Sequence, residues 1–229
     1  MHWIPRGGRM NEKDMEDRLL VQDLSKHYGG FVALAPTSFS LKAGEIATLS
    51  GQNGSGKTTL LTCITNLIRP TSGKVVVDSF DMAVDELEVR RRMVFVPDVQ
   101  RFYTTLTAWE HLRYVAMANN ALDGFDQRAE ALLREFGLWK TRDHFPHNYS
   151  RGMQLKLSLA LAFIRPFTVL LLDEPTSALD EESVALLLDK VDALRDQGVS
   201  ILMSSHNPII KQQFGDRQFL VEEGVLREV

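Results

Sequence analysis

Residues 51–59 read GQNGSGKTT, which matches the phosphate-binding pattern G-x-x-x-x-G-K-[ST]. An apolar strand pattern at residues 46–49 precedes this stretch, and a helical pattern at residues 60–67 follows it. The glycines allow backbone N–H groups to converge on one point, and the dipole of the following helix strengthens this anion site. The residues predicted to bind a nucleotide here are Gly51, Asn53, Gly54, Ser55, Gly56, Lys57, Thr58 and Thr59.

The end of this loop and a later acidic pair carry the groups that a nucleoside triphosphate with Mg²⁺ requires. Lys57 can reach the β- and γ-phosphate oxygens, and Thr58 can offer its hydroxyl to Mg²⁺. Residues 169–172, VLLL, read as a strand buried on both faces, and this strand ends in Asp173 and Glu174. At the carboxyl end of such a strand, Asp173 can hold Mg²⁺ and Glu174 can accept a proton from the attacking water. We therefore expect Lys57 and Glu174 to be catalytic residues.

The composition is that of an ordinary globular protein. The 229 residues are 44% hydrophobic and 24% charged with a formal net charge of -4, so no broad basic field favours binding to DNA or RNA. The longest uncharged apolar stretch, residues 157–164, is far shorter than the roughly 20 residues that cross a bilayer. Residues 1–16 lack the apolar core of a secretion signal and are expected to form a flexible extension. We expect neither a nucleic-acid partner nor a membrane span within the chain.

Strand signals dominate the chain before the phosphate loop, which predicts an antiparallel β portion. The strand-like segments are residues 19–24, 39–41 and 46–50, with turns at 29–30 and 43–44. Beyond the loop, Pro70 is expected to end the first helix, and residues 72–73 are expected to form a turn. Two short apolar runs, residues 75–77 and 93–96, predict further strands.

Helical periodicity takes over between residues 106 and 164, where almost every segment reads as helix. Strands and helices then alternate, with a helix capped by Asp180, a strand at residues 199–203 and a hairpin that turns at 223–224. Such alternation predicts a parallel sheet flanked by helices.

These patterns together predict an α/β fold of the P-loop NTPase class, which is RecA-like and has a mostly parallel sheet core. The expected domain covers residues 17–229 and begins with the antiparallel β portion. A helical subdomain is expected to be inserted in the core at about residues 99–165.

Two further stretches make the resemblance specific. Residues 168–180, TVLLLDEPTSALD, together with residues 149–154, YSRGMQ, resemble the ATPase subunit of an ATP-binding cassette (ABC) transporter, over about residues 19–229. The resemblance implies that ATP is the nucleotide and that the start of a helix clamps its γ-phosphate across a head-to-tail dimer. Ser150, Arg151 and Gly152 occupy this clamp. Arg151 is either a cation near the phosphate or a solvated charge at a helix start.

The resemblance also implies roles for three residues outside these motifs. Tyr28, in LSKHYGG, matches an aromatic that stacks on adenine, although an ordinary tyrosine of an edge strand is the alternative. His206, in ILMSSHN, matches a catalytic histidine that touches the γ-phosphate. Asp98 stands where the family usually has a glutamine, and its carboxylate can bind Mg²⁺ but cannot donate a hydrogen bond.

Asp98 together with the YSRGM stretch resembles subunits that pair with ABC-2, export-type permeases. We therefore expect an ATP-hydrolysing subunit that energises a separate integral membrane permease, for export, from the cytoplasmic face of the membrane. Its other partner is expected to be itself or a homologous subunit. The alternatives are an importer subunit, or a soluble ABC-type ATPase that acts on nucleic acid or ribosomes. Chromosome-maintenance ATPases would require long heptad-patterned coiled coils between the motifs, and the sequence contains no such heptads.

Overall fold

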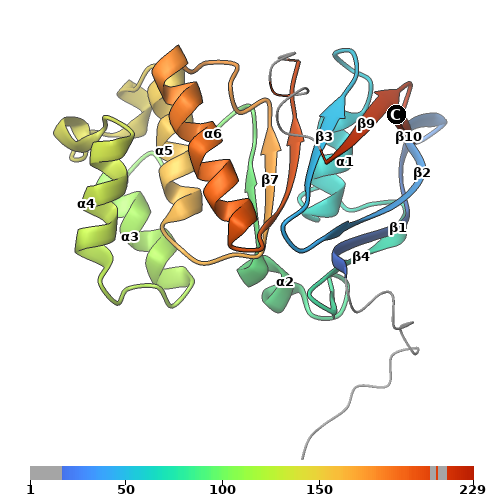
Figure 1. The fold of residues 1–229 in the computed structure, drawn as a ribbon, viewed down its shortest axis with the longest axis horizontal. Coiled ribbons are helices and arrows are strands. Elements are labelled where there is room, and N and C mark those ends of the chain that lie inside the picture. The colour runs from blue at the N-terminus through green and yellow to red at the C-terminus, as the bar shows by residue number, and fades with distance from the viewer. Residues whose placement is uncertain (1–16, 207–209, 211–215) are drawn as a thin grey trace, which may run out of the picture.

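The computed structural model describes residues 17–206, 210 and 216–229, which form two sheets with helices around them (Figure 1). The first sheet is antiparallel and has the strand order β2-β1-β4-β5. Its strands are β1 (Asp17–Tyr28), β2 (Phe31–Lys42), β4 (Ser72–Val77) and β5 (Phe80–Asp81). The predicted antiparallel β portion is therefore confirmed for β1 and β2, whereas residues 46–50 belong to the second, mostly parallel sheet. The predicted flexible extension at residues 1–16 lies outside the described residues.

The second sheet has six strands in the order β10-β9-β3-β8-β7-β6, and its pairs are parallel except for β10 with β9. Its strands are β3 (Ile46–Ser50), β6 (Met93–Val96), β7 (Val169–Asp173), β8 (Ser200–Ser204), β9 (Arg217–Glu222) and β10 (Val225–Glu228). Strands β3, β7 and β8 therefore end at the same edge of the sheet, where ligands bind in α/β folds.

The helices fall into two groups (Figure 1). α1 lies beside β3 and packs its buried residues, including Leu60 and Ile64, against both sheets, whereas the helices on the β6 side gather into a separate layer. The helices are α1 (Lys57–Ile64), α2 (Glu86–Arg92), α3 (Ala108–Ala118), α4 (Phe125–Glu135), α5 (Arg151–Phe163) and α6 (Glu181–Asp196), with short 3-10 turns at Trp139–Thr141 and Pro146–Asn148. No helix in the described part of the chain is long and apolar enough to span a membrane.

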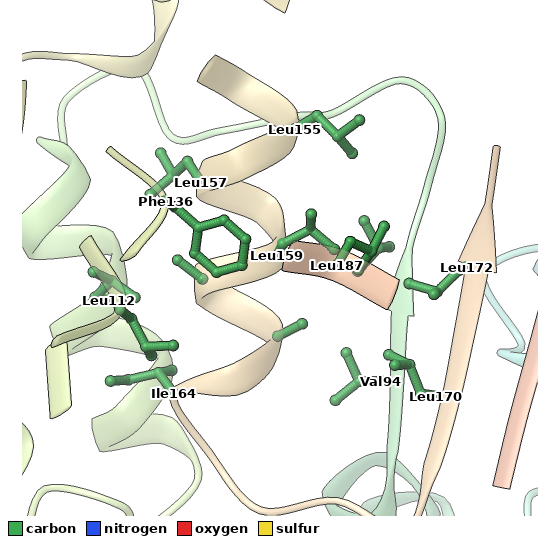
Figure 2. Close-up of a cluster of buried hydrophobic side chains, with 14 of the residues drawn as sticks. Val94, Leu112, Phe136, Leu155, Leu157, Leu159, Ile164, Leu170, Leu172 and Leu187 are labelled. Atoms are coloured by element: carbon green, nitrogen blue, oxygen red, sulfur yellow. The ribbon is translucent and has the colours of Figure 1, made fainter. Parts of the chain in front are cut away.

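A hydrophobic cluster joins the helical layer to the face of the six-stranded sheet. In this cluster, α5 contributes Leu155 and Leu159, and Ile164 follows at the C-terminal end of the helix (Figure 2). These side chains pack with Leu187 of α6 and with strand residues such as Leu170. Each such side chain contributes about 1.5–3 kcal/mol when it is fully buried, so this cluster fixes α5 relative to β7. The amino end of α5 is thereby held at a defined place on the molecule.

Three local predictions were wrong. α1 ends at Ile64 and not near Pro70, because Asn66 adopts a left-handed backbone with φ of 55°. Residues 72–73 begin β4 and do not form a turn, because the chain pairs with β1 at this point. Gly73 lies so close to β1 that an added Cβ would be 2.4 Å from Leu24 Cα. Helix between residues 106 and 164 is also less continuous than expected, because residues 119–124 and most of 136–150 form turns and loops. The boundaries of the expected domain, 17–229, and of the helical subdomain, about 99–165, stay predictions.

Candidate nucleotide-binding site

The phosphate loop is held between the two sheets by contacts that only glycine permits. Gly51 has φ of 141° and Gly56 has φ of 115°, both in the region that favours glycine. A Cβ added at Gly51 would lie 2.2 Å from the Val221 carbonyl oxygen of β9. The N–H of Gly224 also donates to the carbonyl of Ser55 over 2.8 Å. The hairpin of β9 and β10 therefore supports the loop, although its sequence carries no phosphate-binding motif.

Lys57 is buried at the start of α1, and its ammonium lies within the loop. Its Nζ donates to the carbonyl oxygens of Gly51 over 2.7 Å and of Gln52 over 3.1 Å. The same Nζ lies 3.4 Å from His206 Nε2, which in turn lies 3.1 Å from Asn53 Oδ1. Two predicted catalytic residues and one predicted phosphate ligand therefore meet at one point.

The two main residues predicted to bind Mg²⁺ also meet. Thr58 Oγ1 donates to Asp173 Oδ2 over 2.7 Å, and Ser204 Oγ donates to Asp173 Oδ1 over the same distance. Hydroxyl and carboxylate oxygens are the hard ligands that Mg²⁺ prefers, and at nucleotide sites this ion takes most of its other ligands from phosphates and water. Thr58 and Asp173 therefore fit the ion. No cluster of three or more His, Cys, Asp or Glu side chains in the described part of the chain could hold a metal by itself.

Glu174 follows Asp173 with a left-handed backbone, at φ of 47°. Its backbone N–H donates to Ser204 Oγ over 2.8 Å, and its Oε2 accepts from the backbone N–H of His206 over 3.3 Å. His206 Nε2 also lies 3.2 Å from Glu174 Oε1, but this approach lacks the geometry of a hydrogen bond. Glu174 Oε1 is therefore buried without a hydrogen-bond partner among the described residues.

Tyr28 lies at the end of β1, away from these contacts. Its side chain is half exposed, and Lys26 Nζ lies 4.7 Å from the centroid of its ring. An exposed ring is available for stacking, and it is equally the expected state of a tyrosine at a strand end. The role of Tyr28 in adenine binding stays a prediction.

Ser150, Arg151 and Gly152 form the amino end of α5, as predicted for a helix start. Ser150 is the N-cap, and its Oγ accepts from the Met153 N–H over 3.3 Å. A Cβ added at Gly152 would lie 2.7 Å from the Ala178 carbonyl oxygen, so this end packs against the loop before α6. α5 lies on the β6 side of the sheet, three strands from β3 and its phosphate loop (Figure 1). One copy of the chain therefore does not bring Ser150 to Lys57.

Asp98 has different neighbours from the other residues predicted to bind the metal. Its Oδ1 accepts from Arg151 Nη2 over 2.8 Å and from Ser177 Oγ over 3.1 Å. These contacts join the loop after β6, the start of α5 and the loop before α6. They give Asp98 a structural partner in Arg151 and do not place it with Thr58 and Asp173. They also give Arg151 a third role, which the sequence did not suggest.

Ser204, which bonds both Asp173 and Glu174, was not predicted from the sequence. The only signal was its place in SSH, two residues before His206.

A sequence model described as "ABC transporter" matches residues 34–177, more than half of the chain. The chain belongs to the ABC transporter family as an ATP-binding subunit. The P-loop NTPase fold is confirmed, because solved cassettes of this family share the architecture. The activity as an ATPase is confirmed by membership of this family, of which one solved cassette holds ADP and Pi. One solved ATP-binding subunit of an ABC transporter superposes with a TM-score of 0.85 at 30% identity, and the match covers 92% of this chain and 90% of that one. A dimeric cassette bound to ADP and Pi in a post-hydrolysis state gives 0.82 at 26% identity, covering 92% and 97%.

Curated relatives of this ABC ATPase include subunits of both transport directions. The SkfA peptide export ATP-binding protein SkfE of Bacillus subtilis (strain 168) is 31% identical over 91% of this chain and 87% of that protein. The methionine import ATP-binding protein MetN 1 of Bacillus cereus (strain ATCC 10987 / NRS 248) is 30% identical over 87% of this chain and 60% of that protein. Sequence similarity therefore shows the ATPase subunit but leaves the direction of transport open.

Proposed function

We propose that this ABC ATPase hydrolyses ATP with Mg²⁺ in a head-to-tail dimer, and that it energises export through a separate membrane permease. The observation that carries the catalytic part is the buried Oε1 of Glu174, which has no hydrogen-bond partner among the described residues and lies 3.2 Å from His206 Nε2. The backbone N–H of His206 holds the neighbouring Oε2. A buried acceptor without a partner costs about 1–3 kcal/mol, and a functional role is one reason to retain it. Oε1 is the atom that accepts the proton of the attacking water.

The surrounding residues have complementary roles in this mechanism. Lys57 exchanges its loop carbonyls for the β- and γ-phosphate oxygens, and the loop N–H groups bind the remaining phosphate charge. When bound, Mg²⁺ neutralises charge that develops on the phosphates. Thr58 and Asp173 would hold the ion, and the backbone N–H of His206 keeps the Glu174 carboxylate in place.

The dimer is supported by the position of Ser150. Its exposed helix end lies away from the phosphate loop of the same copy, whereas a second copy in a head-to-tail arrangement can supply it. The family's cassettes dimerise, and the family's ATP-binding subunits act with membrane permeases. A position at the cytoplasmic face of the membrane follows from that partnership.

Export is favoured over import by Asp98 and by the YSRGM stretch, and the relatives include the peptide export subunit SkfE. Import is the second candidate, because the relatives include MetN 1. A polytopic membrane protein encoded next to this chain would identify the permease. ATP-driven uptake of its substrate into inside-out vesicles would support export, and ATP-driven release would overturn it. Finding only ribosomal or nucleic-acid partners would overturn the permease itself.

The substitution Glu174→Gln tests the catalytic mechanism. We expect turnover to fall by about 10²- to 10⁴-fold, because an amide cannot act as the general base. ATP binding should persist, so gel filtration with MgATP should show a trapped dimer. Glu182→Gln, in the first turn of α6, is the matched control and should behave as the wild type. Wild-type turnover in Glu174→Gln, or a monomer at every ATP concentration, would contradict the proposal.

A further inference from the structure

Ser204 is a fully buried hydroxyl between two predicted site residues. It ends β8, and the sheet register pairs it with Asp173 at the end of β7. Its Oγ donates to Asp173 Oδ1 over 2.7 Å and accepts from the Glu174 N–H over 2.8 Å. A serine hydroxyl has one proton and two lone pairs. The bond to Asp173 uses the proton, and the bond from Glu174 uses one of the lone pairs.

The bond to Asp173 fixes how that carboxylate can bind a metal. Asp173 is only 1% exposed, and Ser204 occupies Oδ1 while Thr58 contacts Oδ2. A carboxylate held at both oxygens cannot rotate about its terminal bond without losing a hydrogen bond. Groups that hold a ligand in this way typically change metal affinity or activity by about 10- to 100-fold when they are removed.

The bond to Glu174 fixes the backbone of the predicted general base. A non-glycine residue with positive φ costs about 1–3 kcal/mol unless its surroundings enforce the conformation. Ser204 holds the N–H of Glu174, and His206, two residues later, donates to its Oε2. One strand end therefore holds Glu174 at its main chain and at its carboxylate.

We propose that Ser204 is a positioning residue that sets the Asp173 carboxylate for the metal and the Glu174 backbone for water activation. The proposal rests on the proposed function, because it assigns Ser204 to the same hydrolytic site. It extends that function with a residue that acts through two others, Asp173, which would hold the metal, and Glu174, which would activate water.

Ser204→Ala removes the hydroxyl and tests this proposal without relying on turnover alone. The first readout is the gain in affinity that Mg²⁺ gives to a non-hydrolysable ATP analogue, measured by calorimetry with Mg²⁺ and with EDTA. We expect this gain to fall by about tenfold, while affinity in EDTA stays at the wild-type value. The second readout is kcat, which we expect to fall by about 10- to 100-fold with little change in KM.

Ser200→Ala is the matched control. Ser200 lies on the same strand, is equally buried, and donates to the Lys42 carbonyl at the opposite end of β8. Ser200→Ala loses one buried hydrogen bond and Ser204→Ala loses two, so the melting temperature should fall in both variants and further in Ser204→Ala. Only Ser204→Ala should change the Mg²⁺ gain. Should Ser204→Ala fold poorly, Ser204→Cys retains a side chain of similar shape with a weak donor, and the same loss is expected.

Two outcomes would overturn the proposal. One is a wild-type Mg²⁺ gain and kcat in folded Ser204→Ala or Ser204→Cys, and the other is an equal loss in Ser200→Ala. Failure of the hydrolytic mechanism itself has a different signature, because Glu174→Gln would then retain turnover whatever Ser204 does.

Discussion

The phosphate-loop site and the amino end of α5 are predicted halves of one ATP site, yet they are built differently. Around the loop, buried groups bond one another, with Asp173 and Ser204 almost fully buried. At α5, the Arg151 side chain is 61% exposed, and Ser150 bonds only its own helix among the hydrogen bonds described for its side chain. The first half is organised within one chain. The second half presents its polar groups outward, which is how a surface that must meet another molecule is built.

Ser150→Arg breaks the outward half and should have the largest effect among the substitutions that test this comparison. We expect turnover to fall by about 10²- to 10³-fold, because a donor to the γ-phosphate is replaced by a bulky side chain. The affinity of the monomer for ATP should stay unchanged, since Ser150 lies away from the loop of its own copy. Steady-state ATPase rates and nucleotide titrations measure the two quantities.

Mixing Ser150→Arg with Lys57→Ala supplies the control for shared sites. Each variant alone should be inactive, but a mixed dimer contains one site with an intact Lys57 and an intact Ser150. The mixture should therefore recover ATPase activity that neither variant shows alone. No recovery, together with a demonstrated mixed dimer, would contradict the division of one site between two copies.

Tyr28→Ala tests whether the exposed tyrosine ring at the end of β1 binds the adenine base of ATP. We expect ATP affinity to weaken by about tenfold, because a stack of a base on an aromatic ring contributes about 1–3 kcal/mol. Tyr28→Phe should retain wild-type affinity, since the ring persists. Equal affinity for ATP in Tyr28→Ala and the wild type would identify Tyr28 as an ordinary surface tyrosine.

Asp98→Asn sharpens the role of Arg151. The pair is largely exposed, and such pairs contribute about 0–1 kcal/mol, so the melting temperature should hardly change. Loss of the Asp98 charge releases Arg151 toward the phosphate of the opposite copy. We therefore expect the ATP concentration for half-maximal dimerisation to fall by about two- to fivefold. Light scattering measures this concentration, and Arg151→Gln in the same background should cancel the shift.

Asp180→Ala should have the smallest effect, on stability alone. Hydrogen bonds from Ser183 and from Lys156 hold the pKa of the Asp180 carboxyl well below its usual range. A lowered folded pKa adds stability that is present above the unfolded pKa of about 3.9 and is lost as pH falls toward the folded value. The melting temperature of the variant should therefore lie furthest below wild type near neutral pH, and the gap should close in acid. Asp189→Ala, on the same helix, is the control, and an equal gap there would contradict this assignment.

The loop half could be predicted from sequence because its signals are local. The residues from Gly51 to Thr59, the strand ending in Asp173 and Glu174, and the caps Ser150 and Asp180 each lie within a short pattern. Contacts that cross between strands could not be predicted. Ser204 meets Asp173 because β8 pairs with β7, and the local sequence around each residue does not determine that register.

Two kinds of physical origin explain the other failures. The end of α1 depends on one left-handed residue, Asn66, and the start of β4 depends on how closely Gly73 approaches Leu24. The Asp98–Arg151 pair joins residues 53 positions apart. The end of α1 is decided by the backbone conformation of a single residue, and the other two features are decided by contacts between distant residues. Periodicity in a short window records neither.

The support that the β9–β10 hairpin gives the phosphate loop has a practical consequence for protein engineering. Trimming residues 217–229 would leave every recognised motif intact but would remove the Val221 and Gly224 backbone that braces Gly51 and Ser55. A shortened protein of that kind would retain all the sequence motifs, but its phosphate loop would lack the backbone contacts that support it. Truncations and fusions are therefore better designed to keep residues 217–229.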